Sequence, residues 1–204
     1  MAELELELIR EPEDTEIPGI QYIPDYINVE EQNQLLNNID QQGWALDSVD
    51  LTRRIQQHGY RLDYKDGLLV SSTKVGDLPD WADSIGSRLF RGGFTQTVFD
   101  QATVNEYLPG QGVRSHIDCI TCFGRTIAVI SLGSSCVMEL THSQTGERAS
   151  ILLSPGSLLV LQRAARYIWQ HSIPACEVDR YQGKELVRTR RVSLTFREVL
   201  FPHK

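Results

Sequence analysis

From residue 95 onward the sequence is a succession of short apolar or alternating segments, each closed by turn-forming residues. Residues 97–107 end before Pro109-Gly110, and residues 126–132 end at Gly133. Further segments of this kind cover residues 136–140, 149–153, 157–161 and 191–199. Such short runs with frequent turns are typical of antiparallel strands in a sandwich or barrel. The sequence therefore predicts a mainly β fold.

Two segments before residue 95 have the pattern of helices that flank this β core. The first, residues 28–42, starts at Asn28 and has Glu31 three positions later, which is the spacing of a capping box. The second follows Pro79 and ends before Gly92. We also expect a strand at residues 4–9, where Leu alternates with Glu.

The distribution of charge limits the classes of partner. The 204 residues carry a net charge of −7, but residues 1–50 contribute −12 and residues 51–204 contribute +5. An acidic protein is a poor general binder of nucleic acid. The basic main body still allows a local basic groove.

The N-terminus and the hydropathy pattern argue against secretion and membrane integration. No apolar run approaches the ~18 residues that a membrane-spanning helix needs. The first eight residues are acidic and alternating, unlike a signal or transit peptide. We therefore expect a cytoplasmic protein without a membrane partner.

The four cysteines do not have the spacing of a structural zinc site. Cys119 and Cys122 form one C-x-x-C, whereas Cys136 and Cys176 lie far apart in the sequence. We interpret all four as free thiols in a reducing compartment. A redox-sensitive role for the C-x-x-C remains as an alternative, because it lies beside the motif discussed next.

A histidine and a carboxylate could bind one metal ion. His116 and Asp118 are two positions apart, and such residues share a face if they lie in a strand. Alone, the pair would equally suit an ordinary core or surface histidine. With His171 it would complete the two-His, one-carboxylate triad of non-haem Fe(II) oxygenases, which leaves three coordination positions open. The remaining histidines lie in polar or terminal contexts, and we interpret them as solvated: His58, His142 and His203.

Residues 191–197 alternate between polar and apolar side chains. The polar ones are Arg191, Ser193, Thr195 and Arg197. An edge strand with its polar face in water would look the same. If the polar face instead lines a barrel, a guanidinium could bind a carboxylate through two charge-assisted hydrogen bonds. Asn105 and Tyr107, again two positions apart, are neutral groups suited to orienting carboxylate oxygens.

Taken together, these motifs resemble the AlkB family of Fe(II)- and 2-oxoglutarate-dependent dioxygenases. The matching elements are Asn105-x-Tyr107-x-Pro109-Gly110, His116-x-Asp118, His171 and Arg191-x-Ser193-Leu194-Thr195-Phe196-Arg197, in the family's order. The resemblance covers about residues 54–199 and implies a double-stranded β-helix, or jelly roll. It further implies one structural domain, with an N-terminal extension, helices and substrate lid in residues 1–94 and the catalytic core in residues 95–204.

The resemblance also assigns cofactors and their ligands. It implies that Fe(II) is bound by His116, Asp118 and His171. It implies that 2-oxoglutarate, used together with dioxygen, is held by Asn105, Tyr107, Arg191, Ser193 and Arg197. Arg191 would pair with the distal carboxylate, and Arg197 would lie near the iron-bound end.

Within the family, residues 104–118, 157–160 and 167–169 are most similar to the oxygenase domain of the eukaryotic tRNA wobble-uridine hydroxylase. Residues 54–64 resemble the substrate lid. The bacterial DNA-repair members carry an acidic residue two positions after the Asp ligand, where this chain has Ile120. That difference argues against repair of methylated adenine and cytosine.

A nucleobase substrate would have to be single-stranded or flipped out of its duplex to reach a buried metal. Tyr60, Tyr64 and Phe123 are candidates to stack on such a base, with core or lid packing as the alternative. The candidates for phosphate contacts are Arg53, Arg54 and Arg61, with solvated surface charge as the alternative. Arg188 and Arg190 are expected at the surface.

Three functional hypotheses remain open at this point. The first is hydroxylation or oxidative demethylation of a modified nucleobase in DNA or RNA. The second is oxidation of a protein side chain or a small molecule, which the acidic net charge would suit. The third is a non-catalytic barrel, which is disfavoured because a competent residue fills every metal and cosubstrate position. The sequence leaves the oligomeric state open, and we expect a monomer.

Overall fold

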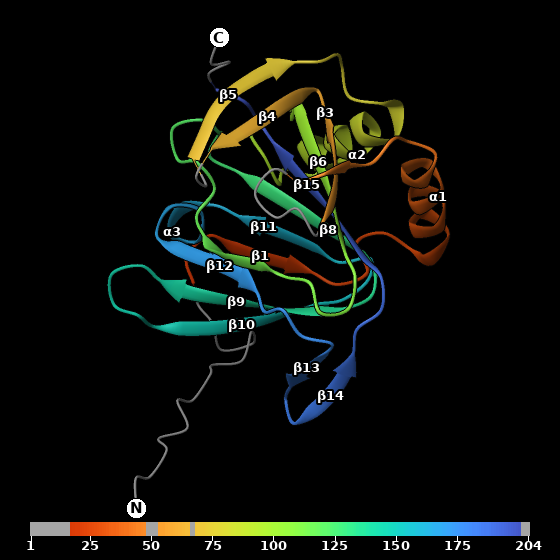
Figure 1. Cartoon of the computed structure of the whole chain (residues 1–204). Coiled ribbons are helices and arrows are strands. Elements are labelled where there is room, and N and C mark those ends of the chain that lie inside the picture. The colour runs from red at the N-terminus through yellow and green to blue at the C-terminus, as the bar shows by residue number, and fades with distance from the viewer. Residues whose placement is uncertain (1–16, 48–52, 66–67, 201–204) are drawn as a thin grey trace, which may run out of the picture.

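A computed structural model of the chain describes residues 17–47, 53–65 and 68–200. The strand expected at residues 4–9 and the side chain of His203 lie outside these ranges. Two antiparallel sheets form the body of the protein (Figure 1). The helices are α1 (Val29–Asp40), α2 (Asp80–Arg91) and α3 (Arg163–Tyr167).

The larger sheet has seven strands and the smaller sheet has four. In spatial order, the larger sheet consists of β1 (Ile20–Ile23), β11 (Leu158–Leu161), β8 (Ile127–Gly133), β15 (Arg191–Arg197), β6 (Gln101–Tyr107), β3 (Arg54–His58) and β2 (Ala45–Leu46). The smaller sheet consists of β10 (Arg148–Leu153), β9 (Cys136–His142), β12 (Trp169–Ile173) and β7 (Val113–His116). Two hairpins complete the fold, β4 (Tyr60–Lys65) with β5 (Leu68–Lys74) and β13 (Val178–Tyr181) with β14 (Lys184–Val187).

The two sheets pack face to face through one hydrophobic core. Val129 and Leu159 of the larger sheet belong to the same buried cluster as Leu140, Ile151 and Trp169 of the smaller sheet. This arrangement confirms the predicted mainly β fold with a jelly-roll core.

A second core lies on the outer face of the larger sheet. There the alternate residues Val192, Leu194 and Phe196 of β15 pack in one buried cluster with Leu35 of α1 and Ile85 of α2. The two long helices therefore cover one face of the larger sheet and leave its other face to the smaller sheet.

Helix α1 confirms the predicted cap. The Asn28 side chain accepts a hydrogen bond from the main-chain amide of Glu31 at 2.9 Å. The Glu31 carboxylate does not complete a capping box. It accepts instead from Arg88 Nη1 at 2.8 Å and so ties α1 to α2. Helix α1 ends at Asp40, two residues before the predicted end.

Strand β15 is central in its sheet, which excludes the alternative that residues 191–197 form an edge strand. It pairs with β6 on one side and with β8 on the other, and all seven of its residues are buried. Its apolar face meets the helices, so its polar face must look into the space between the sheets.

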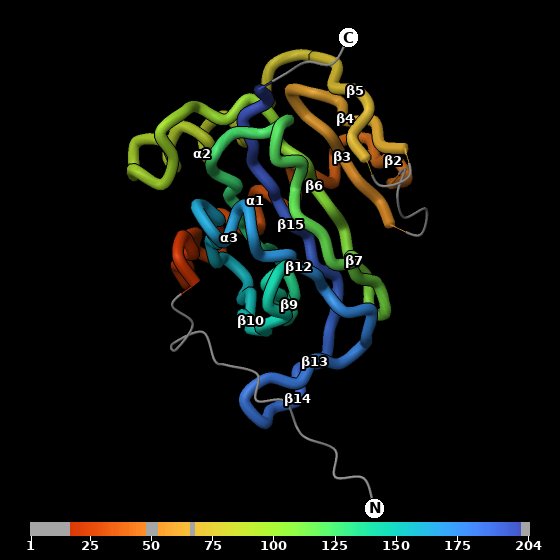
Figure 2. The backbone as a smooth tube through the Cα atoms, turned by 90° about the vertical axis from the view of Figure 1, so that its left-hand side faces the viewer, coloured from red at the N-terminus to blue at the C-terminus, as the bar shows by residue number. Residues whose placement is uncertain are grey.

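The two hairpins project at opposite ends of the molecule. Figure 1 and Figure 2, related by a quarter turn, both place β4–β5 at one end and β13–β14 at the other. Residues 54–64, predicted as a substrate lid, form β3 and most of β4. Within the described ranges, no helix is long and apolar enough to cross a membrane.

Candidate active site

Two of the predicted metal ligands lie directly opposite each other in the smaller sheet. His116 of β7 is the register partner of His171 of β12, and their ring centroids are 4.3 Å apart. His116 Nδ1 lies 2.8 Å from the carbonyl of Arg114, a contact that fixes Nδ1 as the donor and leaves Nε2 free. Burial, reinforced by the neighbouring His116, lowers the pKa of His171 to about 4. Its imidazole is therefore neutral at pH 7, as a metal ligand must be.

Asp118 lies outside the strand in which the sequence placed it. Strand β7 ends at His116, and Asp118 belongs to the connection that follows. Burial alone would raise the pKa of the Asp118 carboxyl, but Arg197, His171 and His116 hold it well below its usual value. The carboxylate is thus charged and within the electrostatic reach of both imidazoles.

The closest partner of the Asp118 carboxylate is a guanidinium. Arg197 Nη2 lies 3.1 Å from Asp118 Oδ1. In the part of the chain that the structure describes, no three His, Cys, Asp or Glu side chains lie in an arrangement that could hold a metal ion. The donor types nevertheless match the two-His, one-carboxylate set of Fe(II) oxygenases.

The residues predicted to hold 2-oxoglutarate line one face of the larger sheet. Across the β15–β6 ladder, Arg191 lies opposite Tyr107 and Ser193 lies opposite Asn105. Arg197 is on the same face of β15, because it is an even number of residues from both. The structure thus brings all five side chains to one polar surface between the sheets.

Arg191 is prepared for an anionic ligand. It is 3% exposed, and its Nη2 donates to Ser131 Oγ at 3.0 Å. Its Nε and Nη1 are buried and have no hydrogen-bond partner among the described residues. Buried donors without a partner cost free energy, and a carboxylate is their best complement. The site therefore fits the distal carboxylate of 2-oxoglutarate.

Arg53 and Arg54 both have partners within the protein. The buried Arg53 cannot contact a phosphate, whereas for the exposed Arg54 a phosphate contact stays a prediction. Arg53 is buried, forms an ion pair with Asp47, and donates through Nη1 to the Tyr107 hydroxyl at 2.8 Å. Arg54 Nε lies 2.6 Å from the carboxylate of Glu106, and its guanidinium stacks on the ring of Trp44. Arg61 is exposed and pairs with Asp63 at the surface, with Nε 3.3 Å from Oδ1.

Two further arginines expected at the surface are engaged in ion pairs. Arg188 is buried, with Nε 2.6 Å from Asp179 Oδ2. Arg190 bridges Asp40 and Glu106, with Nε 2.7 Å from Glu106 Oε1. Neither ion pair could be predicted from the sequence. The partners of Arg190 are remote in the chain, and the partner of Arg188 lies in a hairpin that was not predicted.

The predicted base-stacking aromatics differ in their exposure. Phe123 is fully buried beneath the Arg197 guanidinium, 5.0 Å from it, so no base can stack on it in this arrangement. Tyr60 and Tyr64 are half-buried on β4. Burial raises the pKa of Tyr64 to about 12, and its next-largest interactions are with Arg197 and Asp118, which places it beside the site. His58, expected in solvent, is half-buried against the Trp81 ring.

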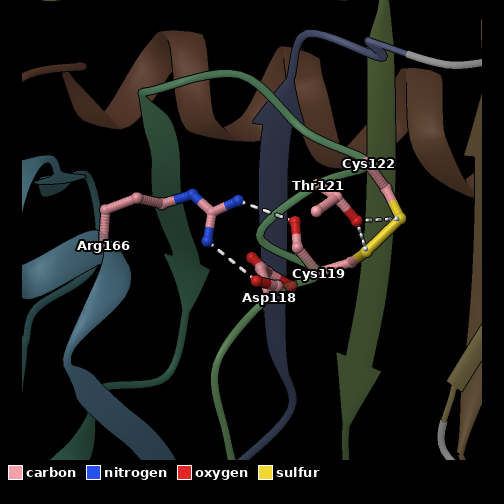
Figure 3. The surroundings of a disulfide bond; sticks show 5 residues. All are labelled: Asp118, Cys119, Thr121, Cys122 and Arg166. Atoms are coloured by element: carbon pink, nitrogen blue, oxygen red, sulfur yellow. Dashed lines mark hydrogen bonds between the residues drawn. A yellow bond between two sulfur atoms is a disulfide. The ribbon is translucent and has the colours of Figure 1, made fainter.

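The structure corrects the prediction that all four cysteines are free thiols. Cys119 and Cys122 form a disulfide, with their Cα atoms 5.4 Å apart, in the turn that follows Asp118 (Figure 3). Cys136 and Cys176 are free, as predicted. Burial raises the pKa of both free thiols.

The structural role of Arg166 could not be predicted from the sequence. This arginine of α3 is 2% exposed and donates to main-chain carbonyls of the same turn (Figure 3). No local pattern announces the contact, because it joins residues 47 and 48 positions apart.

Comparisons with known proteins show which family this chain resembles. The family model described as 2OG-Fe(II) oxygenase superfamily matches residues 19–197. A protein of Arabidopsis thaliana named alkylated DNA repair protein ALKBH8 homolog is 33% identical over 90% of this chain and 59% of its own length. The tRNA (carboxymethyluridine(34)-5-O)-methyltransferase ALKBH8 of Macaca fascicularis is 33% identical over 82% of this chain and 26% of its own length.

The chain therefore spans less than two thirds of either relative. Among solved structures, that of OsALKBH1 superposes with a TM-score of 0.69 at 15% identity, covering 89% of this chain and 97% of the other, which supports the fold. The family model covers most of the chain, and its members use Fe(II), 2-oxoglutarate and dioxygen. From the match over residues 19–197 and from these AlkB-like relatives, we conclude that the chain belongs to the 2OG-Fe(II) oxygenase superfamily.

Proposed function

We propose that this oxygenase hydroxylates or oxidatively demethylates a modified nucleobase in DNA or RNA. The observation that supports the reaction class most directly is Arg191, whose buried Nε and Nη1 have no partner among the described residues. The proposal of a nucleobase substrate draws on the relatives, whose names refer to alkylated DNA repair and to tRNA.

In this proposal, two sets of side chains divide the work of binding. His116, Asp118 and His171 hold Fe(II). Arg191 binds the distal carboxylate of 2-oxoglutarate, and its position is supported by the Tyr107 ring, whose centroid lies 5.3 Å from the guanidinium carbon. The other polar residues of this face, Asn105, Ser193 and Arg197, orient the remaining oxygens of the cosubstrate.

When Fe(II), 2-oxoglutarate and dioxygen are bound, the centre oxidises a C–H bond to C–OH while 2-oxoglutarate becomes succinate and carbon dioxide. On an N-methyl group, the resulting hydroxymethyl amine loses formaldehyde. On a carbon substituent, the alcohol is stable. The protein contributes by holding the reactants in place and by excluding water between the two packed sheets.

The substrate base would enter beside the β4–β5 hairpin. Tyr60 and Tyr64 of β4, both half-buried, would stack on an unpaired base, each contributing roughly 1–3 kcal/mol. Arg61 lies between them on the opposite, exposed face of β4 and could meet the phosphate backbone.

The test is a turnover screen with three substrate classes: methylated DNA, methylated RNA and transfer RNA. Purified protein is supplied with Fe(II) and 2-oxoglutarate, and the products are read by mass spectrometry together with succinate. We expect a mass change in one nucleic-acid class, and His116→Ala should abolish it. His142→Ala, a histidine substitution at the end of β9 in the same sheet, should retain it.

Two results would contradict the proposal. Succinate formed only with a protein or small-molecule substrate would assign the site to another class. Binding of a single-stranded oligonucleotide that does not weaken with salt would argue against phosphate contacts, because those release counterions.

A further inference from the structure

The turn that carries Asp118 is held by hydrogen bonds from one buried arginine. Arg166 Nη1 donates to the carbonyl of Asp118 at 2.8 Å, and Nη2 donates to that of Cys119 at 2.8 Å (Figure 3). Its Nε donates to the carbonyl of Gly124 at 3.3 Å. A single guanidinium thus fixes both ends of the segment 118–124.

These contacts hold the main chain of Asp118 and do not involve its carboxylate. The carboxylate is directed toward Arg197, while the carbonyl is bound by Arg166. A guanidinium is suited to this task, because its planar fork donates in several fixed directions at once, which an ammonium group cannot do. The burial of Arg166, at 2% exposure, further argues that its role is internal.

Arg166 also connects the Asp118 segment to His171. It lies in α3 (Arg163–Tyr167), which leads directly into β12 (Trp169–Ile173), the strand that carries His171. The sheet already fixes His116 relative to His171, because the two are register partners. Asp118 lies beyond the end of β7, so its placement relative to the two imidazoles must come from other contacts.

We propose that Arg166 is a positioning residue that sets the Asp118 carboxylate at the correct place relative to His116 and His171. The inference rests on the proposed function, since it takes these three residues as the metal ligands. In this inference the sheet places His116 relative to His171, and Arg166 places Asp118 relative to both. Partners that orient metal ligands typically change metal affinity by roughly 10- to 100-fold when they are removed.

The experiment compares Mn(II) binding by four proteins, without oxygen, using electron paramagnetic resonance of the free ion. These are the wild type, Arg166→Lys, Arg166→Met and the control Arg163→Met. Arg163 is an exposed residue of the same short helix, so its replacement removes the same charge without touching the segment 118–124. Circular dichroism establishes which variants fold. If Arg166→Met does not fold, the comparison uses Arg166→Lys, which keeps a buried cation.

We expect the Arg166 variants to bind Mn(II) at least about tenfold more weakly than the wild type, and Arg163→Met to bind normally. The visible spectrum of the Co(II)-loaded Arg166→Lys protein should also differ from that of the wild type, because it reports ligand geometry and not overall stability. A folded Arg166 variant with wild-type affinity and an unchanged Co(II) spectrum would overturn this inference and leave the proposed function intact. Failure of the wild type itself to bind Mn(II) would overturn both.

Discussion

The guanidinium of Arg197 and the carboxylate of Asp118 form an ion pair inside the protein, with Arg197 Nη2 3.1 Å from Asp118 Oδ1. The two side chains are only 10% and 8% exposed. Arg197 belongs to β15 of the larger sheet and Asp118 follows β7 of the smaller sheet, so the pair bridges the sheets. Arg197 Nη1 also donates to Thr103 Oγ1 at 3.1 Å, which holds the guanidinium in place without the metal.

Removing only one charge of this ion pair should destabilise the metal-free protein strongly. Arg197→Met leaves the Asp118 carboxylate buried without its partner, and loss of one partner of a buried pair costs about 3–5 kcal/mol. Urea unfolding at pH 7 measures the change. The double variant Arg197→Met with Asp118→Asn should recover part of the loss, because no unpaired charge remains. A loss below about 1 kcal/mol in the single variant would show that the pair contributes little.

Arg191 should behave in the opposite way. Its Nε and Nη1 are buried without partners among the described residues, so the folded protein carries their desolvation cost. We expect Arg191→Met to leave the stability of the ligand-free protein unchanged or to raise it by about 1 kcal/mol. Thermal unfolding without ligand tests this part of the prediction.

The same variant should lose the cosubstrate. Two charge-assisted hydrogen bonds to a carboxylate are each worth about 1.5–3 kcal/mol, so 2-oxoglutarate should bind at least about a hundredfold more weakly. Calorimetric titration of the Mn(II)-loaded protein measures the affinity. An unchanged affinity would mean that Arg191 does not contact the cosubstrate.

Local patterns in the sequence predicted part of this site. The alternation of Arg191 with Ser193 and Arg197 predicted a polar face on one strand, and the spacing of Asn105 and Tyr107 predicted that these two side chains share a face. Both predictions are confirmed as structural statements, because alternation is a local property of strands. The helix start at Asn28 is confirmed for the same reason, since the cap bond spans three residues.

The sequence could not predict contacts between remote residues. It does not reveal that Arg53 would bury itself against Tyr107, or that Arg166 would bind the turn after β7. It also suggested a strand through Asp118, although this turn is fixed by a distant arginine and by a disulfide. Such contacts depend on which surfaces the fold brings together, and no periodicity encodes them.

Acid should weaken the junction between α1 and the larger sheet through Glu106. Hydrogen bonds from Arg54, and then from Arg190, hold the pKa of the Glu106 carboxyl below its usual 4.5, although burial opposes them. A carboxyl with a lowered pKa in the folded state stabilises the protein above its unfolded-state pKa. That stabilisation is lost as the pH falls through the folded-state value, so it should decline progressively as the pH falls below about 4.5.

The variant Glu106→Gln isolates this contribution. At pH 7 we expect it to be less stable than the wild type by about 1–2 kcal/mol, because it loses charge-assisted hydrogen bonds to partly exposed arginines. The difference should shrink between pH 5 and about pH 3, as measured by urea unfolding. Glu185→Gln, which breaks an exposed pair with Arg180, should change stability little at any of these pH values. A constant difference for Glu106→Gln across the range would contradict the assignment.

The Cys119–Cys122 disulfide should determine how many cysteines can be alkylated, and it should also contribute to the stability of the folded protein. Alkylation of the unfolded, unreduced protein should modify only Cys136 and Cys176, as counted by mass spectrometry. After a dithiol has transferred two electrons and two protons to the disulfide, and has itself become a cyclic disulfide, all four cysteines should react. Four alkylated cysteines before reduction would show that the bond does not form in the purified protein.

Reduction should destabilise the folded protein by only about 2 kcal/mol, because the closed loop is very short. Cys119→Ser with Cys122→Ser should reproduce the loss without reductant, and Cys176→Ser should not. Arg166 holds carbonyls on both sides of this loop independently of the disulfide. The reduced protein should therefore keep its Mn(II) affinity within a few-fold of the oxidised protein. A tenfold loss on reduction would instead identify the disulfide, and not Arg166 alone, as what positions Asp118.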